Sequence, residues 1–275
     1  MTTLVDTETE YKPITYAERS AFYETEHATD MDAVFLTSFL TDGVNSVLEV
    51  PCGVGRNVFH FAKHGIEVVG VDLEKEMVAQ AERRKFDPLH SSFAANISFL
   101  QGDMRSLELG RTFDLVVTPI DAFQLLLSDD DALSALKSLG GCVSSRGNLL
   151  LDLASFGDSS LSKRSRPIFY NPNQEDGTIV YEWTRPLPNG GTLMRSRIQM
   201  HDGELMKFRF LYKADAEGII RKLYTDLTLR MYTRQHIEQL VHRAGLQIVT
   251  AFGNHDREPL DDKSARLIYA LRPRS

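Results

Sequence analysis

The chain has 275 residues, enough for one large domain with an insertion or for two small domains. Its net charge is −7 at pH 7 and it has no basic stripe, which argues against a protein that tracks a nucleic-acid backbone. No apolar run approaches the roughly 18 residues of a membrane span, and the N-terminus lacks an apolar signal core. The two cysteines, Cys52 and Cys142, have neither disulfide nor metal-ligand spacing. We therefore expect a cytoplasmic protein without a metal site.

The first 45 residues divide into two segments. Residues 1–15 are polar and acidic, and we expect them to be flexible. Residues 16–45 carry apolar and aromatic side chains at helical spacing, among them Phe22, Tyr23 and Phe35. This spacing predicts one or two helices that form an N-terminal lid.

Residues 46–155 alternate between short apolar runs and helical patterns. Strands are predicted at 46–50, 67–71, 96–100, 113–118 and 148–153, and helices at 57–63, 74–84 and 129–139. Ser128 is the expected N-cap of the last helix, which begins with three acidic residues. Continuous apolar strands that alternate with helices indicate a parallel sheet covered on both faces.

The pattern changes in residues 156–232. Four longer segments rich in β-branched and aromatic residues (178–187, 192–201, 204–213 and 219–232) are separated by hairpin signals at 188–191, 202–203 and 217–218. Residues 233–275 then return to the α/β pattern, with a helix at 234–243 capped by Thr233 and an antiparallel edge pair at 246–252 and 265–271. The predicted fold is α/β: a Rossmann-like, doubly wound, mostly parallel seven-stranded sheet, with an antiparallel β-meander insertion that covers the acceptor site.

Three polar features follow successive predicted strands. The first strand ends in Glu49 and runs into a glycine-containing turn with Gly53 and Gly55, where the backbone can approach a ligand closely. The second ends at Asp72, which can accept hydrogen bonds from ribose hydroxyls. The third is followed by Gly102-Asp103-Met104, whose carboxylate and sulfur suit adenine. A nicotinamide dinucleotide site would require a third glycine where this chain has Val58.

These features lie within the sequence blocks VLEVPCGVGRN, VVGVDLEKEMV, LQGDMRSL and FDLVVTPIDAFQLL. Residues 46–153 resemble the core of class I S-adenosylmethionine-dependent methyltransferases. The whole chain resembles small-molecule members, namely amino-sugar N,N-dimethyltransferases and enzymes like glycine/sarcosine N-methyltransferase. One departure is Pro51, where that class usually has glycine.

The resemblance implies a set of residues for S-adenosylmethionine. Glu49, Gly53 and Gly55 would form the methionine loop, Asp72 would bind the ribose, and Asp103 would hold the adenine. The full expected set is Tyr16, Tyr23, Glu49, Cys52, Gly53, Gly55, Arg56, Asn57, Asp72, Leu73, Met77, Gly102, Asp103, Met104, Pro119, Ile120 and Phe123.

Residues near the reacting group are harder to select. The expected catalytic candidates are Tyr16, Asp121, Gln124 and Glu182. Arg195 and Arg197 share one strand face, and they either bind an anionic acceptor or form a solvated surface. The remaining candidates, for which a surface or core position is an equal or better reading, are Tyr11, His27, Trp183, Arg185, His201, Arg209, His255 and Asp256.

These observations favour methyl transfer to nitrogen or oxygen of a small-molecule metabolite in bacterial secondary metabolism. The alternatives are a C-methyltransferase, a nicotinamide-dependent oxidoreductase and a non-catalytic ligand-binding domain; an RNA or protein methyltransferase fits the acidic charge and the covered site less well. The expected partner is a small-molecule acceptor, with no nucleic acid and no membrane, and a homodimer stays open.

Overall fold

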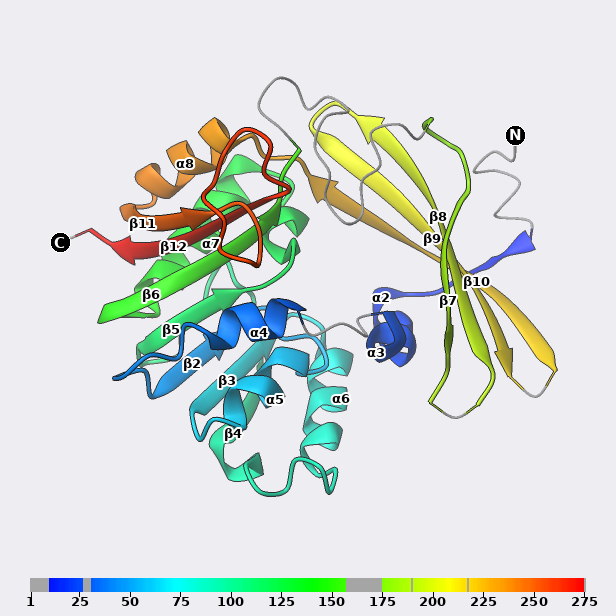
Figure 1. The fold of residues 1–275 in the computed structure, drawn as a ribbon, viewed down its shortest axis with the longest axis horizontal. Coiled ribbons are helices and arrows are strands. Elements are labelled where there is room, and N and C mark those ends of the chain that lie inside the picture. Colours follow the sequence, from blue (N-terminus) through cyan, green and yellow to red (C-terminus); the bar gives the residue numbers. More distant parts are fainter. Residues whose placement is uncertain (1–9, 27–30, 157–174, 189, 217, 275) are drawn as a thin grey trace.

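The computed structural model describes residues 10–26, 31–156, 175–188, 190–216 and 218–274. Two sheets dominate it (Figure 1). The larger has seven strands in the order β11-β12-β6-β5-β2-β3-β4. Their bounds are β2 (Ser46–Glu49), β3 (Glu67–Asp72), β4 (Ile97–Gln101), β5 (Phe113–Thr118), β6 (Val143–Ala154), β11 (Leu246–Phe252) and β12 (Arg266–Pro273). Strand β12 is antiparallel to both neighbours and the other pairs are parallel, so the predicted mostly parallel sheet with an antiparallel closing pair is confirmed.

Helices cover both faces of this sheet. One face packs against α7 (Asp129–Gly141) and α8 (Arg234–Arg243), and the other against α4 (Met31–Thr37), α5 (Arg56–Ala62) and α6 (Lys75–Lys85). The strands are apolar on both sides for this reason: Val47 belongs to one buried cluster, whereas Leu48 belongs to the other. Ser128 and Thr233 cap α7 and α8 with their hydroxyl groups, as predicted. Two short 3-10 turns, η2 (Ala94–Asn96) and η3 (Ala122–Leu125), lie in the connections.

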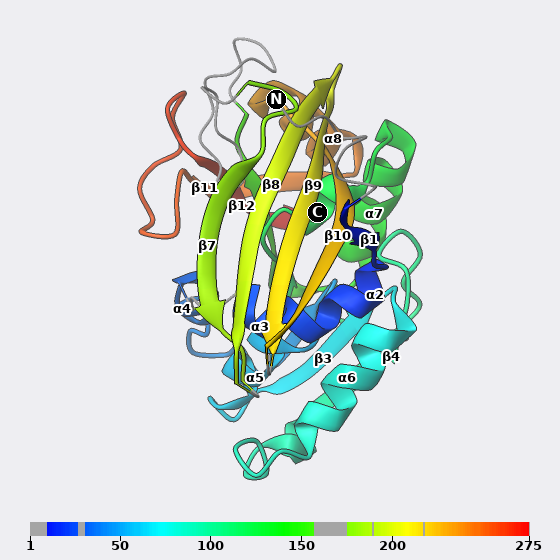
Figure 2. The ribbon, with the colours of Figure 1, turned by 90° about the vertical axis from the view of Figure 1, so that its right-hand side faces the viewer.

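The second sheet is the predicted meander, and we call it the meander sheet. It contains β1 (Lys12–Pro13), β7 (Val180–Pro186), β8 (Thr192–Asp202), β9 (Leu205–Ala216) and β10 (Ile219–Arg230), in the order β1-β10-β9-β8-β7. Strands β7 to β10 are antiparallel, and β1 adds a parallel edge next to β10. The meander sheet stands opposite the ends of β2, β3 and β5 that carry the predicted site (Figures 1 and 2).

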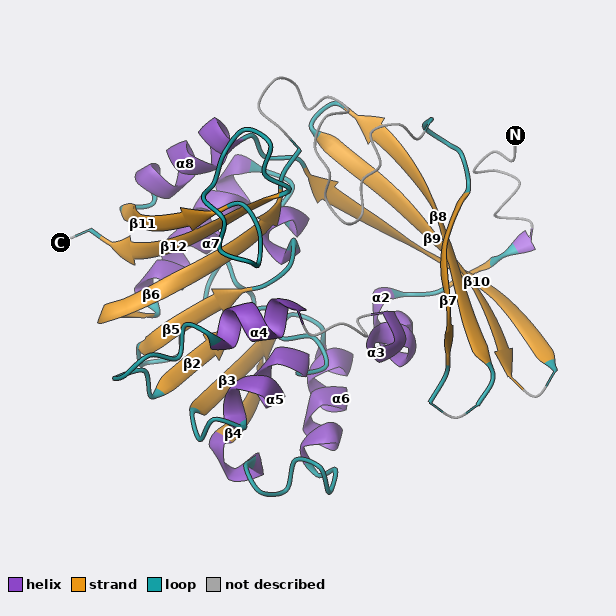
Figure 3. Cartoon of the chain, in the orientation of Figure 1, coloured by secondary structure: helices purple, strands orange, loops and turns teal. Residues whose placement is uncertain are grey.

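The N-terminal segment connects the two sheets (Figure 3). Helix α2 (Tyr16–Arg19), the 3-10 turn η1 (Ser20–Phe22) and α3 (Tyr23–Glu26) pack on the inner face of the meander sheet, where the Phe22 and Tyr212 rings lie 5.4 Å apart. Helix α4, by contrast, buries Phe35 and Leu36 in the core of the larger sheet. The predicted lid therefore consists of two parts: α2 to α3 pack on the meander sheet, and α4 packs on the larger sheet.

Two expectations concern the ends of the chain and the membrane. Part of the segment expected to be flexible is ordered as β1, and Ile14 N–H donates to the Tyr224 carbonyl at 2.8 Å; residues 1–9 lie outside the described residues. No helix in the described part of the chain is long and apolar enough to cross a membrane.

Candidate cofactor and acceptor site

The loop after β2 is shaped by two glycines with left-handed backbone. Gly53 has φ 54° and Gly55 has φ 84°, conformations that L side chains rarely adopt. A Cβ on Gly55 would lie 2.8 Å from the Phe99 ring, so close packing also excludes a side chain there. The loop begins at a cis Val50–Pro51 bond, and the Cys52 N–H donates to the Val71 carbonyl at 2.8 Å. The turn therefore holds its backbone against the end of β3.

Glu49 is the buried acid of this loop. It is 2 % exposed, and its Oε1 accepts one hydrogen bond from Asn57 Nδ2 at 3.2 Å. Its Oε2 and the Asn57 Oδ1 have no hydrogen-bond partner among the residues that the structure describes. Burial raises the pKa of Glu49 to about 8, and the nearby Arg56 charge only partly opposes this. A buried carboxyl group with an unused oxygen suits a cationic ligand, such as the ammonium of a methionine moiety.

Arg56 has a partner that the sequence did not reveal. Its Nη1 donates to Asp32 Oδ1 at 2.8 Å and its Nη2 to Asp32 Oδ2, which forms a bidentate pair between α5 and α4. The pair attaches α4 to the helix that begins at the cofactor loop. Arg56 thus holds α5, which begins directly after the loop, against α4. Its direct contact with the cofactor stays a prediction.

Asp72 lies at the end of β3 and organises the same loop. Its Oδ2 accepts from the Gly53 N–H at 2.7 Å, and its Oδ1 accepts from the Glu74 N–H at 2.9 Å. Burial raises its pKa, and the two backbone donors oppose the shift. Each carboxylate oxygen keeps a second lone pair, so the predicted ribose contact is compatible with this arrangement.

Asp103 differs from the other two acids because it is held by a basic residue. Arg105 donates to it through Nε at 3.0 Å and through Nη2 at 2.6 Å, and these hydrogen bonds lower the pKa of the Asp103 carboxyl group. Arg105 also reaches Asp131 at the start of α7. An adenine amino group at this position would share the carboxylate with Arg105, a competition that the strand-end pattern did not predict.

The other cofactor candidates fall into exposed and buried groups. Leu73 is exposed beside Asp72, where an apolar side chain is free to cover a ligand. Met77 is fully buried and Cys52 is buried, and burial raises the pKa of the Cys52 thiol. Met104 is half-buried against the core, and Gly102 has no room for a Cβ because Val71 lies 2.9 Å away.

The turn after β5 is strained and carries a buried ion network. Ile120 (φ 26°) and Asp121 (φ 58°) are consecutive non-glycine residues with positive φ, a conformation often found at functional sites. Arg266 of β12 donates to Asp121 at 2.7 Å and to Asp152 at 2.5 Å, and His255 Nε2 lies 2.9 Å from the other Asp152 oxygen. Asp121 Oδ2 is buried and has no hydrogen-bond partner in the described part of the chain. Burial raises the Asp121 pKa; for Asp152 the effect of burial is outweighed by the Arg266 charge and by the hydrogen bond with His255, which lower its pKa.

Two candidates on η3 have mainly structural contacts. Gln124 Nε2 donates to the Arg230 carbonyl at 2.9 Å and to the Ala154 carbonyl at 3.4 Å, and its Oε1 accepts from the Ala154 N–H at 2.8 Å. The amide is therefore fully used, and Gln124 holds both ends of the insertion rather than a reacting group. Phe123 is fully buried in the core, where its ring lies 5.9 Å from that of Tyr232, and its contact with the cofactor stays a prediction.

The inner face of the meander sheet carries a buried charged cluster. Glu182 Oε2 accepts from Arg195 Nε at 2.6 Å, and Arg195 Nη1 lies 3.4 Å from Glu26 Oε1. Glu26 also accepts from Arg19 Nε at 2.9 Å and from the Tyr212 hydroxyl. This cluster was not predicted as a unit, because its members lie far apart in the sequence.

Two of the predicted tyrosines belong to the helices beside this cluster. Tyr23 lies next to the cofactor loop, since a Cβ on Gly53 would be 3.7 Å from its ring. Tyr16 begins α2, but the placement of its side chain, like the whole of His27, lies outside what the structure describes. Helix α3 thus touches the cofactor loop through Tyr23 and the charged cluster through Glu26.

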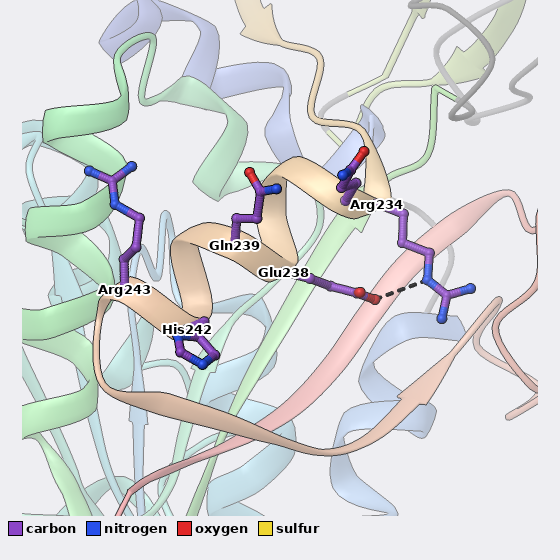
Figure 4. Close-up of a pocket in the computed structure, with 6 residues that line it drawn as sticks. Arg234, Glu238, Gln239, His242 and Arg243 are labelled. Atoms are coloured by element: carbon purple, nitrogen blue, oxygen red, sulfur yellow. Dashed lines mark hydrogen bonds and ion pairs between the residues drawn. The ribbon is translucent and has the colours of Figure 1, made fainter.

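A separate open hollow of about 670 Å³ lies on the surface of α8. It is lined by Arg234, Glu238, Gln239, His242 and Arg243, and Arg234 donates to Glu238 at 2.9 Å (Figure 4). None of the predicted site residues contributes to it. We therefore place the candidate site at the strand ends and not in this hollow.

Comparisons with known proteins agree with this location. Residues 47–147, which include the loop, Asp72 and Asp103, match the family model described as "Methyltransferase domain". The chain is 31 % identical over 132 residues to the putative methyltransferase YqeM of Bacillus subtilis, an alignment that covers 45 % of this chain and only about half (51 %) of that protein. It is 28 % identical over 219 residues to a dTDP-3-amino-3,4,6-trideoxy-alpha-D-glucopyranose N,N-dimethyltransferase of Streptomyces venezuelae, covering 79 % of this chain and 81 % of the relative.

The fold agrees over a longer stretch. The crystal structure of Streptomyces venezuelae DesVI superimposes with a TM-score of 0.70 at 18 % identity, covering 94 % of this chain and 99 % of that one. Residues 47–147 are therefore a methyltransferase domain, and the strand order and the loop agree with those of class I S-adenosylmethionine-dependent methyltransferases. Among such enzymes the chain resembles the amino-sugar N,N-dimethyltransferases.

Proposed function

We propose that this protein transfers a methyl group from S-adenosylmethionine to an amine nitrogen of a small-molecule metabolite in bacterial secondary metabolism. The observation that carries the proposal is the buried Glu49 carboxyl group, whose Oε2 has no partner beside a glycine loop with no room for a side chain at Gly55. This site fits a cationic amino-acid moiety. The Glu49 carboxyl group can bind its ammonium, and the glycine loop lets the protein backbone approach it closely. When bound, S-adenosylmethionine supplies the electrophilic methyl group.

Under this proposal, the protein contributes position, exclusion of water and proton handling. Glu49 binds the ammonium of the cofactor, Asp72 binds its ribose hydroxyls, and the exposed Leu73 covers the adenosine. The meander sheet and α3 cover the strand ends and limit the access of water. Nitrogen is favoured over oxygen because an amine is a good nucleophile once its ammonium form has lost a proton, whereas a hydroxyl group gains more from a general base.

Asp121 is the proposed acidic group closest to the chemistry. Its Oδ2 is buried without a hydrogen-bond partner, and it follows β5 on the same edge as the cofactor loop. Its raised pKa makes it a better proton acceptor than an ordinary aspartate. Arg266 and the strained turn hold the carboxylate in place, so an acceptor ammonium would meet an oriented oxygen.

The proposal is tested by two measurements on the full chain. Calorimetry should show binding of S-adenosylhomocysteine and no binding of NADH. Mass spectrometry should then detect a gain of one or two methyl groups on an amino sugar or a related amine, with loss of activity in Asp121→Asn but retained binding of S-adenosylhomocysteine. Absence of S-adenosylhomocysteine binding would overturn the cofactor assignment, whereas methylation of hydroxyl but not amine acceptors would overturn the choice of nitrogen.

A further inference from the structure

Arg197 is a buried cation that shares its nearest described anion, Glu182, with Arg195. It lies in the middle of β8, opposite Phe210 of β9, and it is 5 % exposed. Its guanidinium carbon is 5.8 Å from the centre of the Phe208 ring. Its Nε and Nη1 are buried, and neither has a hydrogen-bond partner within residues 10–26, 31–156, 175–188, 190–216 and 218–274. Buried guanidinium groups are normally paired, because desolvating an uncompensated charge is costly.

The neighbouring acids do not meet this need. Glu182 Oε2 is committed to Arg195 at 2.6 Å, and its Oε1 lies 3.5 Å from Arg197 Nε without forming a hydrogen bond. The second acid of the cluster, Glu26, pairs with Arg19 at 2.8 Å and with Arg195 at 3.4 Å. Among the described residues of the cluster, two carboxylates therefore serve three guanidinium groups, and the excess positive charge lies at Arg197.

The position of Arg197 relates it to the proposed acceptor site. Its neighbour Arg195, on the same face of β8, contacts α3, and α3 contacts the cofactor loop through Tyr23. On its other side, Phe208 belongs to the same buried cluster as Ala154 at the end of β6. Arg197 therefore lies on the inner face of the meander sheet, between the part that contacts α3 beside the cofactor loop and the part that packs on the end of β6. The low exposure of Arg195 and Arg197 also excludes the solvated face that the sequence left open.

We propose that Arg197 is an anion subsite for the acceptor, which carries a carboxylate or a phosphate group in addition to its methylated nitrogen. The inference deepens the proposed function and rests on it. A carboxylate or phosphate oxygen pair matches the end-on donor fork that Nη1 and Nη2 of a guanidinium group form, and here Nη1 has no hydrogen-bond partner among the described residues. Glu182 remains hydrogen-bonded to Arg195 and lies near Arg197 Nε, which leaves Nη1 to the ligand.

The test uses the full chain and simple anions. Calorimetric titrations with inorganic phosphate, pyrophosphate and acetate, at constant ionic strength in chloride, are made with and without S-adenosylhomocysteine. We expect at least one of the three anions to bind the wild type and to bind Arg197→Gln about tenfold or more weakly. Binding of phosphate or pyrophosphate indicates a phosphate group on the acceptor, and binding of acetate indicates a carboxylate group.

The matched control is Arg209→Gln. Arg209 lies on the opposite face of the same sheet, where it donates to Asp226 at 2.7 Å, so its loss should leave anion binding unchanged. The inference is overturned if none of the anions binds the wild type or if Arg197→Gln binds them equally well. Failure of S-adenosylhomocysteine to bind would instead contradict the proposed function. The two failures can be told apart because the anion titrations are also made without S-adenosylhomocysteine.

A second variant separates ligand binding from structure. Arg197→Met removes a buried charge whose ion pair with Glu182 is long, at 3.5 Å, and makes no hydrogen bond, so we expect its melting temperature to equal or exceed that of the wild type. Addition of the binding anion should raise the melting temperature of the wild type and leave that of Arg197→Met unchanged. A large fall in the melting temperature of Arg197→Met would show that the guanidinium serves the fold, and would overturn the inference.

Discussion

Replacement of Glu49 by glutamine tests the centre of the proposed cofactor site. Because the pKa of Glu49 is raised to about 8, the side chain is mostly neutral at pH 7, and glutamine is close in shape to a neutral glutamic acid. The bond from Asn57 Nδ2 to the side-chain oxygen can be kept. Glu49→Gln should therefore change the free energy of unfolding near pH 6 by less than about 1 kcal/mol.

Binding should respond much more strongly than folding. The carboxylate would make a charge-assisted hydrogen bond to the cofactor ammonium, an interaction worth about 1.5–3 kcal/mol. Loss of that amount weakens the affinity for S-adenosylhomocysteine roughly ten- to a hundredfold. Isothermal titration calorimetry measures this directly, with Glu76→Gln, an exposed acid of α6, as the control that should bind like the wild type.

The pH dependence gives a second, independent readout. A bound ammonium favours the ionised carboxylate, so binding lowers the Glu49 pKa and releases a proton. The wild-type affinity should then rise between about pH 6 and pH 8, by at most about tenfold per pH unit, and Glu49→Gln should lose this rise. Without ligand the sign is opposite: the raised pKa stabilises the fold at low pH, and this contribution is lost as the pH rises from about 4.5 through about 8. Equal affinity and equal pH dependence of the two proteins would refute the role given to Glu49.

Three further changes test neighbouring elements. Asp72→Asn should weaken S-adenosylhomocysteine binding about tenfold or more, since it removes a charged acceptor for the ribose and for the Gly53 N–H; an unchanged dissociation constant would contradict the ribose role. Gly55→Ala should lower the free energy of unfolding by about 1–3 kcal/mol in denaturant titrations, because φ is 84° and Phe99 lies in the way; wild-type stability would contradict this. Gln124→Leu should cost about 2–4 kcal/mol of stability with S-adenosylhomocysteine affinity unchanged, and a selective loss of affinity would show a direct role.

The cofactor half of the molecule could be predicted because its signals are local. Each strand is a continuous apolar run, and the polar residues Glu49, Asp72 and Asp103 follow three of these runs in order. Parallel strands bring such ends to one edge without any knowledge of distant contacts. The caps Ser128 and Thr233 are equally local, since each hydroxyl binds an N–H three residues along the chain.

The ion networks could not be predicted because they join distant segments. Asp152 and Arg266 are 114 positions apart, and Tyr212 and Glu26 are 186 apart. The one signal in the sequence is Asp152 itself, a charged residue inside the apolar run of β6, which requires a buried partner. The sequence identified that Arg195 and Arg197 share a face, but strand alternation does not reveal which face is covered.

The lid shows a different limit. Helical spacing over residues 16–45 correctly indicated helices, but the same spacing fits packing on either sheet. The partner of α4 is decided by the Arg56–Asp32 pair and by the burial of Phe35 and Leu36 in the core of the larger sheet, and helical spacing does not reveal either partner.

The double attachment by Gln124 joins both ends of the insertion at one point of the larger domain. One amide side chain ties the last residue of β6 to the last residue of β10, so the whole insertion is fastened to the larger sheet where it leaves and where it returns. The family-model match, residues 47–147, contains Gln124 but none of the insertion. Under the proposed function, the inner face of the meander sheet is free to diversify toward new acceptors while the cofactor machinery is inherited unchanged.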